Sequence, residues 1–290
     1  MEKEKDLPAG SDRPRDARLA ESAKRESRKA EARQRRRAFV ESLALNAGDI
    51  LMSYFGNSPK TTLKKKNDVV TEADLKVEKI LAGRIRKAFP EHKILSEETV
   101  KDTFGPDDMV WVIDPLDGTN NFSVGLPTFC TSIALWQGDT ALIGAIYTPV
   151  YRDLYLAERG LGAYKNGHPL QVRTNEHERL TLLAELPLST LETGQETHRS
   201  LYELLPHISH YRLLGSAATD LALVASLPGC LSYVTHCKAW DLAAGSLIAS
   251  EAGARVTDLD GNAVTLRSTN FLAAHPLLHA HIFPLTKAHA

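Results

Sequence analysis

The sequence predicts an α+β fold, in which an antiparallel sheet with two helices is followed by an α/β half. Apolar residues recur at helical spacing over residues 39–56 and again over residues 73–90. From about residue 110 to 172 the pattern changes to short strands joined by turns, which is typical of an antiparallel meander. Beyond about residue 175 strands and helices alternate. We therefore expect an N-terminal half at residues 38–175 and a C-terminal half at residues 176–290.

The N-terminal half begins with two helices separated by a basic loop. The first helical segment ends at Gly56, and three consecutive lysines follow at positions 64–66. Thr71 and Asp74 have the spacing of a capping box, so the second helix is expected to begin there. The strands expected next are Val110–Ile113, Thr131–Trp136, Ala141–Tyr147, Leu154–Ala157 and two short arms around Asn166-Gly167. Asn-Gly favours a tight hairpin because both positions tolerate a positive φ.

The C-terminal half alternates between apolar strands and amphipathic helices. Its expected strands are Leu180–Ala184, Tyr211–Leu214, Leu231–Thr235, Ala254–Thr257 and Phe271–Ala274. Its expected helices are Leu201–Leu205, Ala217–Ser226, Leu242–Glu251 and Leu277–Ile282. This alternation predicts an α/β arrangement.

The composition is that of an ordinary globular protein. The chain has 290 residues, of which 43% are hydrophobic and 24% charged, enough to bury one large core or two smaller ones. This excludes collagen-like, disulfide-scaffold and wholly disordered chains. No apolar run approaches the ~20 residues of a membrane span, and the three cysteines show no metal-ligand pairing. We expect a soluble, cytoplasmic protein with free thiols that makes no membrane contact.

The first 37 residues, here called the arm, differ from the rest. They hold 13 Lys or Arg and 8 Asp or Glu, a net charge of +5, whereas residues 38–290 hold 22 and 28, a net charge of −6. With few large apolar side chains the arm cannot hold a core, and we expect a frayed helix or a disordered segment. The acidic remainder makes nucleic acid an unexpected partner. The run Arg33–Arg37 leaves nucleic-acid or anionic-surface binding by the arm as an alternative.

The stretch WVIDPLDGTNNF, residues 111–122, holds the strongest indication of chemistry. Asp114 follows a continuous apolar strand. Pro115 cannot donate to a sheet and holds Asp114 extended, so the strand is expected to break there. The break frees the carbonyl of Leu116 and places Asp117 beside Asp114.

The next residues, Gly118-Thr119-Asn120, permit a tight turn whose amides can point at an anion, especially if a short helix begins there. Two carboxylates, a free carbonyl and such a turn beside a buried strand would repel one another and lose hydration. A hard divalent cation resolves this conflict, and Mg²⁺ prefers carboxylates, carbonyls and water. The structural alternative is a polar turn with a capping Asp.

Three further segments supply acidic side chains. Glu97 and Glu98 follow the apolar pair Ile94-Leu95, Asp241 opens a helix at its expected N-cap, and Asp74 lies in the capping box. Taken singly, each also has a structural explanation as a surface carboxylate or a helix cap.

Taken together and in this order, these segments closely resemble the inositol monophosphatase family of magnesium-dependent, lithium-sensitive phosphatases. The resemblance covers roughly residues 38–275 and implies a layered αβαβα sandwich of the sugar phosphatase type, with the metal site between the two halves. It also implies a homodimer. The matching segments are DVVTEAD (68–74), ILSEET (94–99), IDPLDGTNNF (113–122) and WDLAAGSLIASEAGA (240–254).

The resemblance also implies a role for each matching residue. Two to three Mg²⁺ ions would be held by Glu97, Asp114, the Leu116 carbonyl, Asp117, Asp241 and, through water, Asp74. Glu98 and Thr119 would orient the attacking water, and Asp117 would act with them. The pocket for a small phosphorylated metabolite would be lined by Gly118, Thr119, Asn120, Gly215, Ser216, Ala217 and Asp241.

The resemblance leaves the substrate open. Inositol-hydrolysing members carry an acidic residue six positions before the Trp of the WD motif, where this chain has Val234. The missing carboxylate removes charge-assisted hydrogen bonds to a polyol. Inositol-1-monophosphatase-like activity is the first expectation. The alternatives are fructose-1,6-bisphosphatase, 3'(2'),5'-bisphosphate nucleotidase and histidinol-phosphatase activity on the same fold, or an inactive metal-binding or regulatory relative.

Overall fold

The computed structural model describes residues 13–57, 61–65, 68–174, 179–185 and 201–287. The chain divides into two units, one up to Phe39 and one from Val40 to Ala290, which is here called the body. The boundary expected between residues 175 and 176 lies outside the described residues. Within the described part, no helix is both long and apolar enough to cross a membrane.

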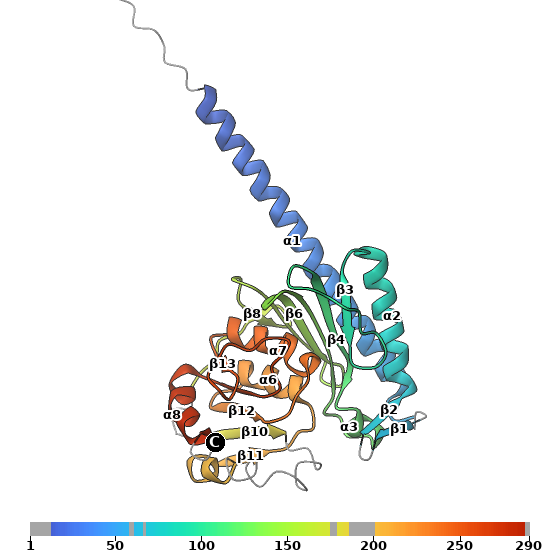
Figure 1. Ribbon diagram of the computed structural model, residues 1–290, viewed down its shortest axis with the longest axis vertical. Helices are drawn as coiled ribbons and strands as arrows, with labels where there is room; N and C mark the ends of the chain where they lie inside the picture. Colours follow the sequence, from blue (N-terminus) through green and yellow to red (C-terminus); the bar gives the residue numbers. More distant parts are fainter. Residues whose placement is uncertain (1–12, 58–60, 66–67, 175–178, 186–200, 288–290) are drawn as a thin grey trace, which may run out of the picture. The chain divides into compact units, whose positions relative to one another are not determined.

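The first helix, α1 (Arg13–Tyr54), begins in the arm and ends in the body (Figure 1). The arm is therefore helical from Arg13 onward. At its other end, Gly56 has a φ of +79° and terminates the helix as expected. Of the residues that recur at helical spacing, the body part of α1 buries Val40, Leu43, Ala47 and Leu51, whereas Ile50 and Tyr54 are half-buried.

The second helix, α2 (Glu72–Ala88), starts with the capping box that the sequence predicts. Thr71 is its N-cap, and the Asp74 carboxylate accepts a hydrogen bond from the Thr71 amide at 2.9 Å. The preceding basic segment is not a simple loop, because β1 (Thr61–Lys65) and β2 (Asp68–Thr71) pair as a two-stranded antiparallel ribbon.

The larger sheet of the body has seven strands in the order β3-β4-β5-β6-β7-β8-β9. It is antiparallel as predicted except at β3 and β4, which run parallel. The strands are β3 (Lys93–Ser96), β4 (Met109–Asp117), β5 (Cys130–Gln137), β6 (Thr140–Thr148), β7 (Asp153–Glu158), β8 (Ala163–Lys165) and β9 (His168–Pro169).

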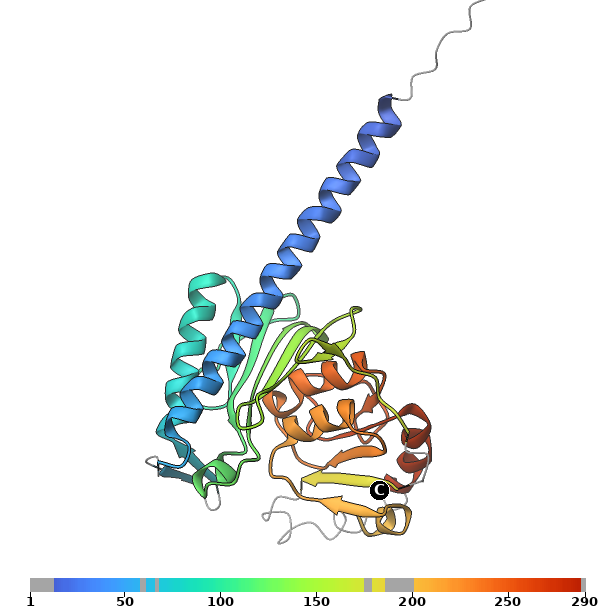
Figure 2. The same cartoon turned by 180° about the vertical axis from the view of Figure 1, so that it is seen from behind.

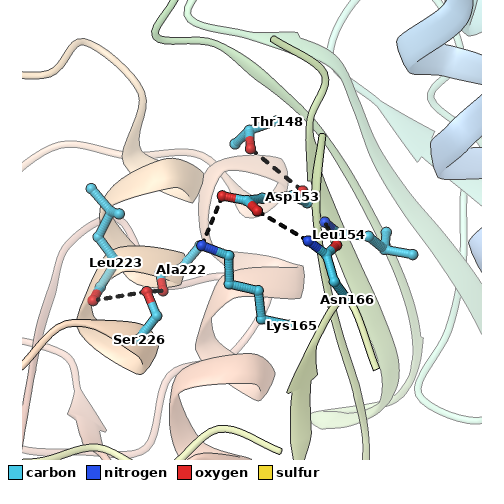
Figure 3. Close-up of polar contacts among 8 residues, drawn as sticks. All are labelled: Thr148, Asp153, Leu154, Lys165, Asn166, Ala222, Leu223 and Ser226. Carbon is cyan, nitrogen blue, oxygen red and sulfur yellow. Dashed lines mark hydrogen bonds and ion pairs between the residues drawn. The ribbon is translucent and has the colours of Figure 1, made fainter. Parts of the chain in front are cut away.

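The predicted Asn-Gly hairpin joins β8 to β9. Asn166 has a φ of +50° and Gly167 a φ of +81°. Figure 3 shows that the Asn166 side chain also binds β7: its carbonyl accepts from the Leu154 amide at 2.7 Å, and its amide donates to Asp153 at 3.1 Å. Lys165 forms an ion pair with Asp153 at 2.7 Å. The turn therefore fixes the edge of the larger sheet as well as reversing the chain.

The smaller sheet has five strands in the order β11-β10-β12-β14-β13. The strand β10 pairs in parallel with β11 and β12, whereas β14 is antiparallel to β12 and β13. The strands are β10 (Thr181–Glu185), β11 (His210–Arg212), β12 (Cys230–Val234), β13 (Arg255–Thr257) and β14 (Phe271–Ala274). This confirms the strands expected in the C-terminal half.

Helices α6 (Ala217–Ser226) and α7 (Ala239–Glu251) lie between the two sheets (Figure 2). Ala222 and Ala243 pack with residues of the larger sheet, whereas Leu221 and Leu242 pack with the smaller one. Helix α8 (Pro276–Thr286) packs Leu278 against the opposite face of the smaller sheet. Because α2 and the part of α1 from Val40 onward lie on the outer face of the larger sheet, the layers confirm the αβαβα sandwich (Figures 1 and 2).

The close approach of α7 to the larger sheet depends on one glycine. A Cβ built on Gly144 of β6 would lie 2.9 Å from the Cα of Ala244. Such a distance leaves no room for a methyl group, so the absence of a side chain here sets how near α7 lies to the sheet. This packing fixes the start of α7, where Asp241 lies.

Candidate active site

The acidic residues singled out by the sequence come together at one end of the larger sheet. The chain leaves β3 at Glu97, whose amide donates to the Ile113 carbonyl of neighbouring β4 at 3.1 Å. Asp114 and Asp117 lie in the last part of β4. Asp241 reaches the same region from the first turn of α7. Asp74 of α2 adds a fourth segment, so four separate segments contribute carboxylates.

The strand β4 does not end at Asp114, contrary to the expectation from Pro115. It continues to Asp117 through a β-bulge, in which Asp114 pairs with Ser132 and Asp117 with Cys130. Three residue steps on β4 therefore match two on β5, which takes up the proline without ending the ladder. The Asp114 carboxylate accepts from the Leu116 amide at 3.0 Å, which holds the bulge together.

A short helix, α3 (Thr119–Ser123), begins directly after the bulge, as the sequence indicated. Gly118 has a φ of +93°, and a Cβ there would lie 2.9 Å from the Thr128 carbonyl oxygen, so the position requires glycine. The Thr119 hydroxyl lies 2.9 Å from the Leu116 carbonyl oxygen and 3.1 Å from Asp74 Oδ1. Thr119 therefore donates to the Leu116 carbonyl or to Asp74, and in either case the carbonyl keeps a lone pair for a further partner.

The expected pocket residue Ser216 contacts Asp117 instead of facing solvent. Ser216 is buried, and its hydroxyl donates to Asp117 Oδ2 at 2.7 Å. The Ala218 amide donates to the same oxygen at 2.8 Å. Two donors at the start of α6 thus fix one oxygen of Asp117, across 99 residues of sequence. Ser216 orients an acidic side chain, which spacing alone did not reveal.

The other expected pocket residues lie around this contact. Gly215 has a φ of +69°, and a Cβ there would lie 3.1 Å from the Asn121 side chain. Asn121 donates to the Thr128 carbonyl at 2.7 Å and to the Leu214 carbonyl at 2.6 Å. Asn121 therefore joins α3 to the segment that carries Gly215. Ala217 is buried, and Asn120 is exposed.

Asp241 is not the N-cap of α7, which corrects the expectation. The cap is Lys238, and Asp241 lies three residues later in the first turn. Its carboxylate accepts from the Lys238 amide at 2.6 Å, so it performs the capping from inside the helix. Val234 occupies the position at which inositol-hydrolysing members of the family carry an acidic residue. It is fully buried in β12 within the apolar core.

The segment with Glu97 and Glu98 is held by an acidic residue that the sequence analysis missed. Glu78 of α2 is 2% exposed and accepts from the Glu98 amide at 3.1 Å and the Thr99 amide at 3.0 Å. It also accepts from the Thr99 hydroxyl. Glu78 occurs four positions after Asp74, one helical turn along α2, which was the available signal.

Two more carboxyl groups were missed, half-buried Glu185 at the end of β10 and buried Asp220 in α6. Glu185 accepts from the Ser216 amide at 3.0 Å. Asp220 is fully buried, and within the described residues neither of its carboxylate oxygens has a hydrogen-bond partner. Burial raises the pKa of Asp220 well above its usual range, and the charges of Glu185 and Asp117 raise it further. The sequence around them, LLAELP and GSAATD, contains no motif that indicates a functional site.

The electrostatics show that the predicted residues are close in space. Burial raises the pKa of Asp114 well above its usual range, and the nearby negative charges raise it further; they belong to Glu97, Asp117, Asp241 and Asp74. Burial likewise raises the pKa of Asp241, with Asp117 adding to the effect. The pKa of Asp74 and that of Asp117 rise to about 6, mainly through burial. In the ionised state this cluster is costly without a compensating positive charge.

The donor set has the chemistry that Mg²⁺ prefers. It consists of carboxylates and one carbonyl, with one oxygen of Asp114, Asp117 and Asp241 fixed by protein donors. In the described ranges, no three Asp, Glu, His or Cys side chains already stand where they would hold a metal ion. Buried, mutually repelling oxygen ligands fit a hard dication.

Comparison with known proteins shows the family to which the chain belongs. The model of the inositol monophosphatase family matches residues 32–290. The chain belongs to the inositol monophosphatase family. Most of the arm lies outside the matched region, whereas every acidic residue of the cluster lies inside it.

The similar proteins differ in their names. The protein named Nus factor SuhB of Pasteurella multocida is 38% identical over 218 residues, covering 75% of this chain and 82% of that protein. A Thermotoga maritima protein named fructose-1,6-bisphosphatase/inositol-1-monophosphatase is 32% identical over 245 residues, covering 84% and 93%. The crystal structure of extragenic suppressor protein suhB from Bartonella henselae has a TM-score of 0.80 and 32% identity, covering 87% and 98%. The fold of the body is thus that of the family.

Proposed function

We propose that this chain is a Mg²⁺-dependent phosphate monoester hydrolase acting on a small polyol or sugar phosphate, with an inositol monophosphate as the first candidate substrate. The observation that carries the proposal is the convergence of carboxylates from four segments, whose burial and mutual repulsion raise the pKa of Asp114 and Asp241. A folded protein gains nothing in stability from such an arrangement. A function that uses the negative charge accounts for it.

The ligands proposed for the ions are those that the family resemblance implies: Glu97, Asp114, the Leu116 carbonyl, Asp117, Asp241 and, more distantly, Asp74. The chemistry that Mg²⁺ supplies when bound is positive charge beside the phosphate dianion and beside the departing oxygen. The protein keeps these oxygen ligands in place through donors from Leu116, Ser216 and Lys238.

Water would be the nucleophile, positioned by Glu98 and Thr119. The Thr119 hydroxyl lies within reach of Asp74 and of the Leu116 carbonyl, so its proton is directed to one of them and its lone pair is available to a water. A carboxylate at Glu98 would accept a proton of that water. The backbone amides of Gly118 and Thr119 would hold phosphate oxygens.

The reaction is a direct displacement at phosphorus. The water oxygen forms a bond to phosphorus, and the bond from phosphorus to the ester oxygen breaks. The departing oxygen takes up a proton, which gives the free alcohol and inorganic phosphate. The proposal needs no phosphoenzyme, because alignment with electrostatic stabilisation is sufficient for this reaction.

The proposed substrate class is supported by the names of the relatives. Val234 supplies no carboxylate for ring hydroxyls, because its side chain is aliphatic, and it is buried in the core. A relative at 32% identity is named for both fructose 1,6-bisphosphate and inositol 1-phosphate hydrolysis, which supports a broad sugar-phosphate specificity here. Lithium inhibition and a homodimer belong to the same proposal, and an activity assay with LiCl and a solution mass measurement test them.

Phosphate release from a panel of substrates tests the proposal. The panel is inositol 1-phosphate, fructose 1,6-bisphosphate, a 3'-phosphoadenosine nucleotide and histidinol phosphate, each with Mg²⁺ or with chelator. We expect Mg²⁺-dependent release from at least one polyol or sugar phosphate. Relatives with 33–38% identity bear the name Nus factor, so a regulatory protein without hydrolase activity is the second candidate. Saturable Mg²⁺ binding with no phosphate release from any member of the panel would favour that second candidate.

A further inference from the structure

The arm concentrates positive charge that the remainder of the chain lacks. Residues 13–37 hold 11 Lys or Arg and 4 Asp or Glu, a net charge of +7, whereas residues 40–290 hold 22 and 28, a net charge of −6. The family match begins at residue 32, so most of this segment lies outside the part shared with the family. We propose that the helical arm binds the phosphate backbone of double-stranded nucleic acid.

The helix displays positive charge along its length and on more than one side. Lys24, Arg28 and Arg35 are exposed, and their spacings of four and seven residues place them on the same side of α1, which they share with Glu31. Arg33 is exposed on the opposite side. A helix over residues 13–37 is about 37 Å long at 1.5 Å per residue, close to one turn of a duplex at about 34 Å. Its width suits a major groove of about 12 Å.

The composition of the arm selects this partner over the other polyanions. Residues 1–38 contain no aromatic residue, so the arm cannot stack on the bases of a single strand. Between residues 13 and 38 the only large apolar residue is Leu19, so the helix has no apolar face to insert into a membrane surface. What the sequence supplies is repeated positive charge at helical spacing, which recognises regularly spaced phosphates.

The test uses the full chain and a variant that keeps the helix. Lys24, Arg28, Arg33 and Arg35 are replaced together by glutamine, which is similarly favourable in a helix, and circular dichroism checks that the helix content is unchanged. Binding is measured by fluorescence anisotropy with a 24-base-pair DNA duplex, an RNA duplex of the same length and a single strand, from 50 to 200 mM salt. Vesicles with phosphatidylserine provide the membrane comparison.

A matched control removes the same number of charges from the body. Lys79, Arg86, Lys87 and Arg159 are all exposed and lie outside the acidic cluster. Their joint replacement by glutamine is expected to leave duplex binding near that of the unmodified chain. A general loss of charge would weaken both variants equally, whereas a binding surface in the arm is weakened only by the arm substitutions.

The salt dependence gives the expected magnitude. A helix with about six phosphate contacts loses affinity about 10³-fold between 50 and 200 mM salt, and with four contacts removed the loss falls to about tenfold. Comparing the two duplexes shows whether the arm prefers double-stranded DNA or double-stranded RNA. Binding to either duplex supports the proposal. Duplex binding that the arm substitutions leave unchanged, a preference for the single strand, binding to vesicles alone, or no binding at 50 mM salt would each overturn it.

Discussion

Glu185 offers a quantitative test of the electrostatics of the acidic cluster. Burial raises its pKa from 4.5 to about 7, and the charge of Asp117 adds to the increase, against hydrogen bonds from the amides of Ser216 and Gly215. A carboxyl group whose pKa is raised on folding binds more protons in the folded state than in the unfolded state. Its contribution to stability is therefore complete below pH 4.5 and is lost as the pH rises through about 7.

The perturbation is Glu185→Gln, studied in chelator at pH 5.5 and pH 8. With these two pKa values, the unmodified group favours the folded state by about 2 kcal/mol at pH 5.5 and by almost nothing at pH 8. Gln cannot titrate, and its carbonyl oxygen still accepts from the Ser216 amide. The unmodified protein should therefore lose about 2 kcal/mol more than the variant over this interval, or about 4–8 °C in melting temperature.

The assay is thermal or urea unfolding of both proteins at both pH values. The change in stability between the two pH values is compared for the unmodified protein and the variant, so that the effects of the other titrating groups cancel. One of these groups is buried His279, whose pKa is lowered to about 4 by burial and whose pH effect has the opposite sign. Equal pH dependence of the two proteins would refute the account, because it would mean that Glu185 titrates normally and does not share the charged environment of Asp117.

Three further substitutions address other contacts. Asp117→Asn keeps an acceptor oxygen for its protein donors but removes a charge that repels Asp114 and Asp241, so phosphate release should fall by about 10²-fold or more without a fall in melting temperature; near-normal release would contradict the assignment. Ser216→Ala removes a hydrogen bond to a charged group, worth about 1.5–3 kcal/mol, and should raise the Mg²⁺ concentration for half-maximal thermal stabilisation about 10-fold or more; an unchanged midpoint would show that Ser216 does not position Asp117. Gly144→Ala places a methyl group against Ala244 and should lower the free energy of unfolding by about 1–3 kcal/mol in urea; no loss would mean that α7 moves away freely.

Local sequence patterns predicted most of the elements correctly. The capping box at Thr71, the Asn166-Gly167 hairpin and the helix Ala217–Ser226 each depend on interactions within a few residues, which the sequence displays directly. The layered arrangement came from the resemblance to the family and not from periodicity, because the packing of α6 and α7 between two sheets involves contacts between distant segments.

The differences lie where tertiary contacts decide. Pro115 was expected to end a strand, but the neighbouring strand β5 accommodates it in a bulge. Asp241 was expected to cap α7 from outside, and the chain instead turns three residues earlier. Glu185 and Ser216 were missed as supports of the acidic cluster because their roles depend on contacts across many residues of sequence. No local pattern contains that information.

Calorimetric titration of the metal-free protein with Mg²⁺ tests the central claim most directly. With a pKa of about 6, Asp74 and Asp117 are partly protonated at pH 6 and ionised at pH 8. Mg²⁺ requires ionised ligands, so saturable binding should release protons at pH 6 and fewer at pH 8, as measured in buffers of different ionisation enthalpy. Absence of saturable binding at both pH values, or binding that Asp114→Asn leaves unchanged, would contradict the claim that this cluster exists to hold a divalent cation.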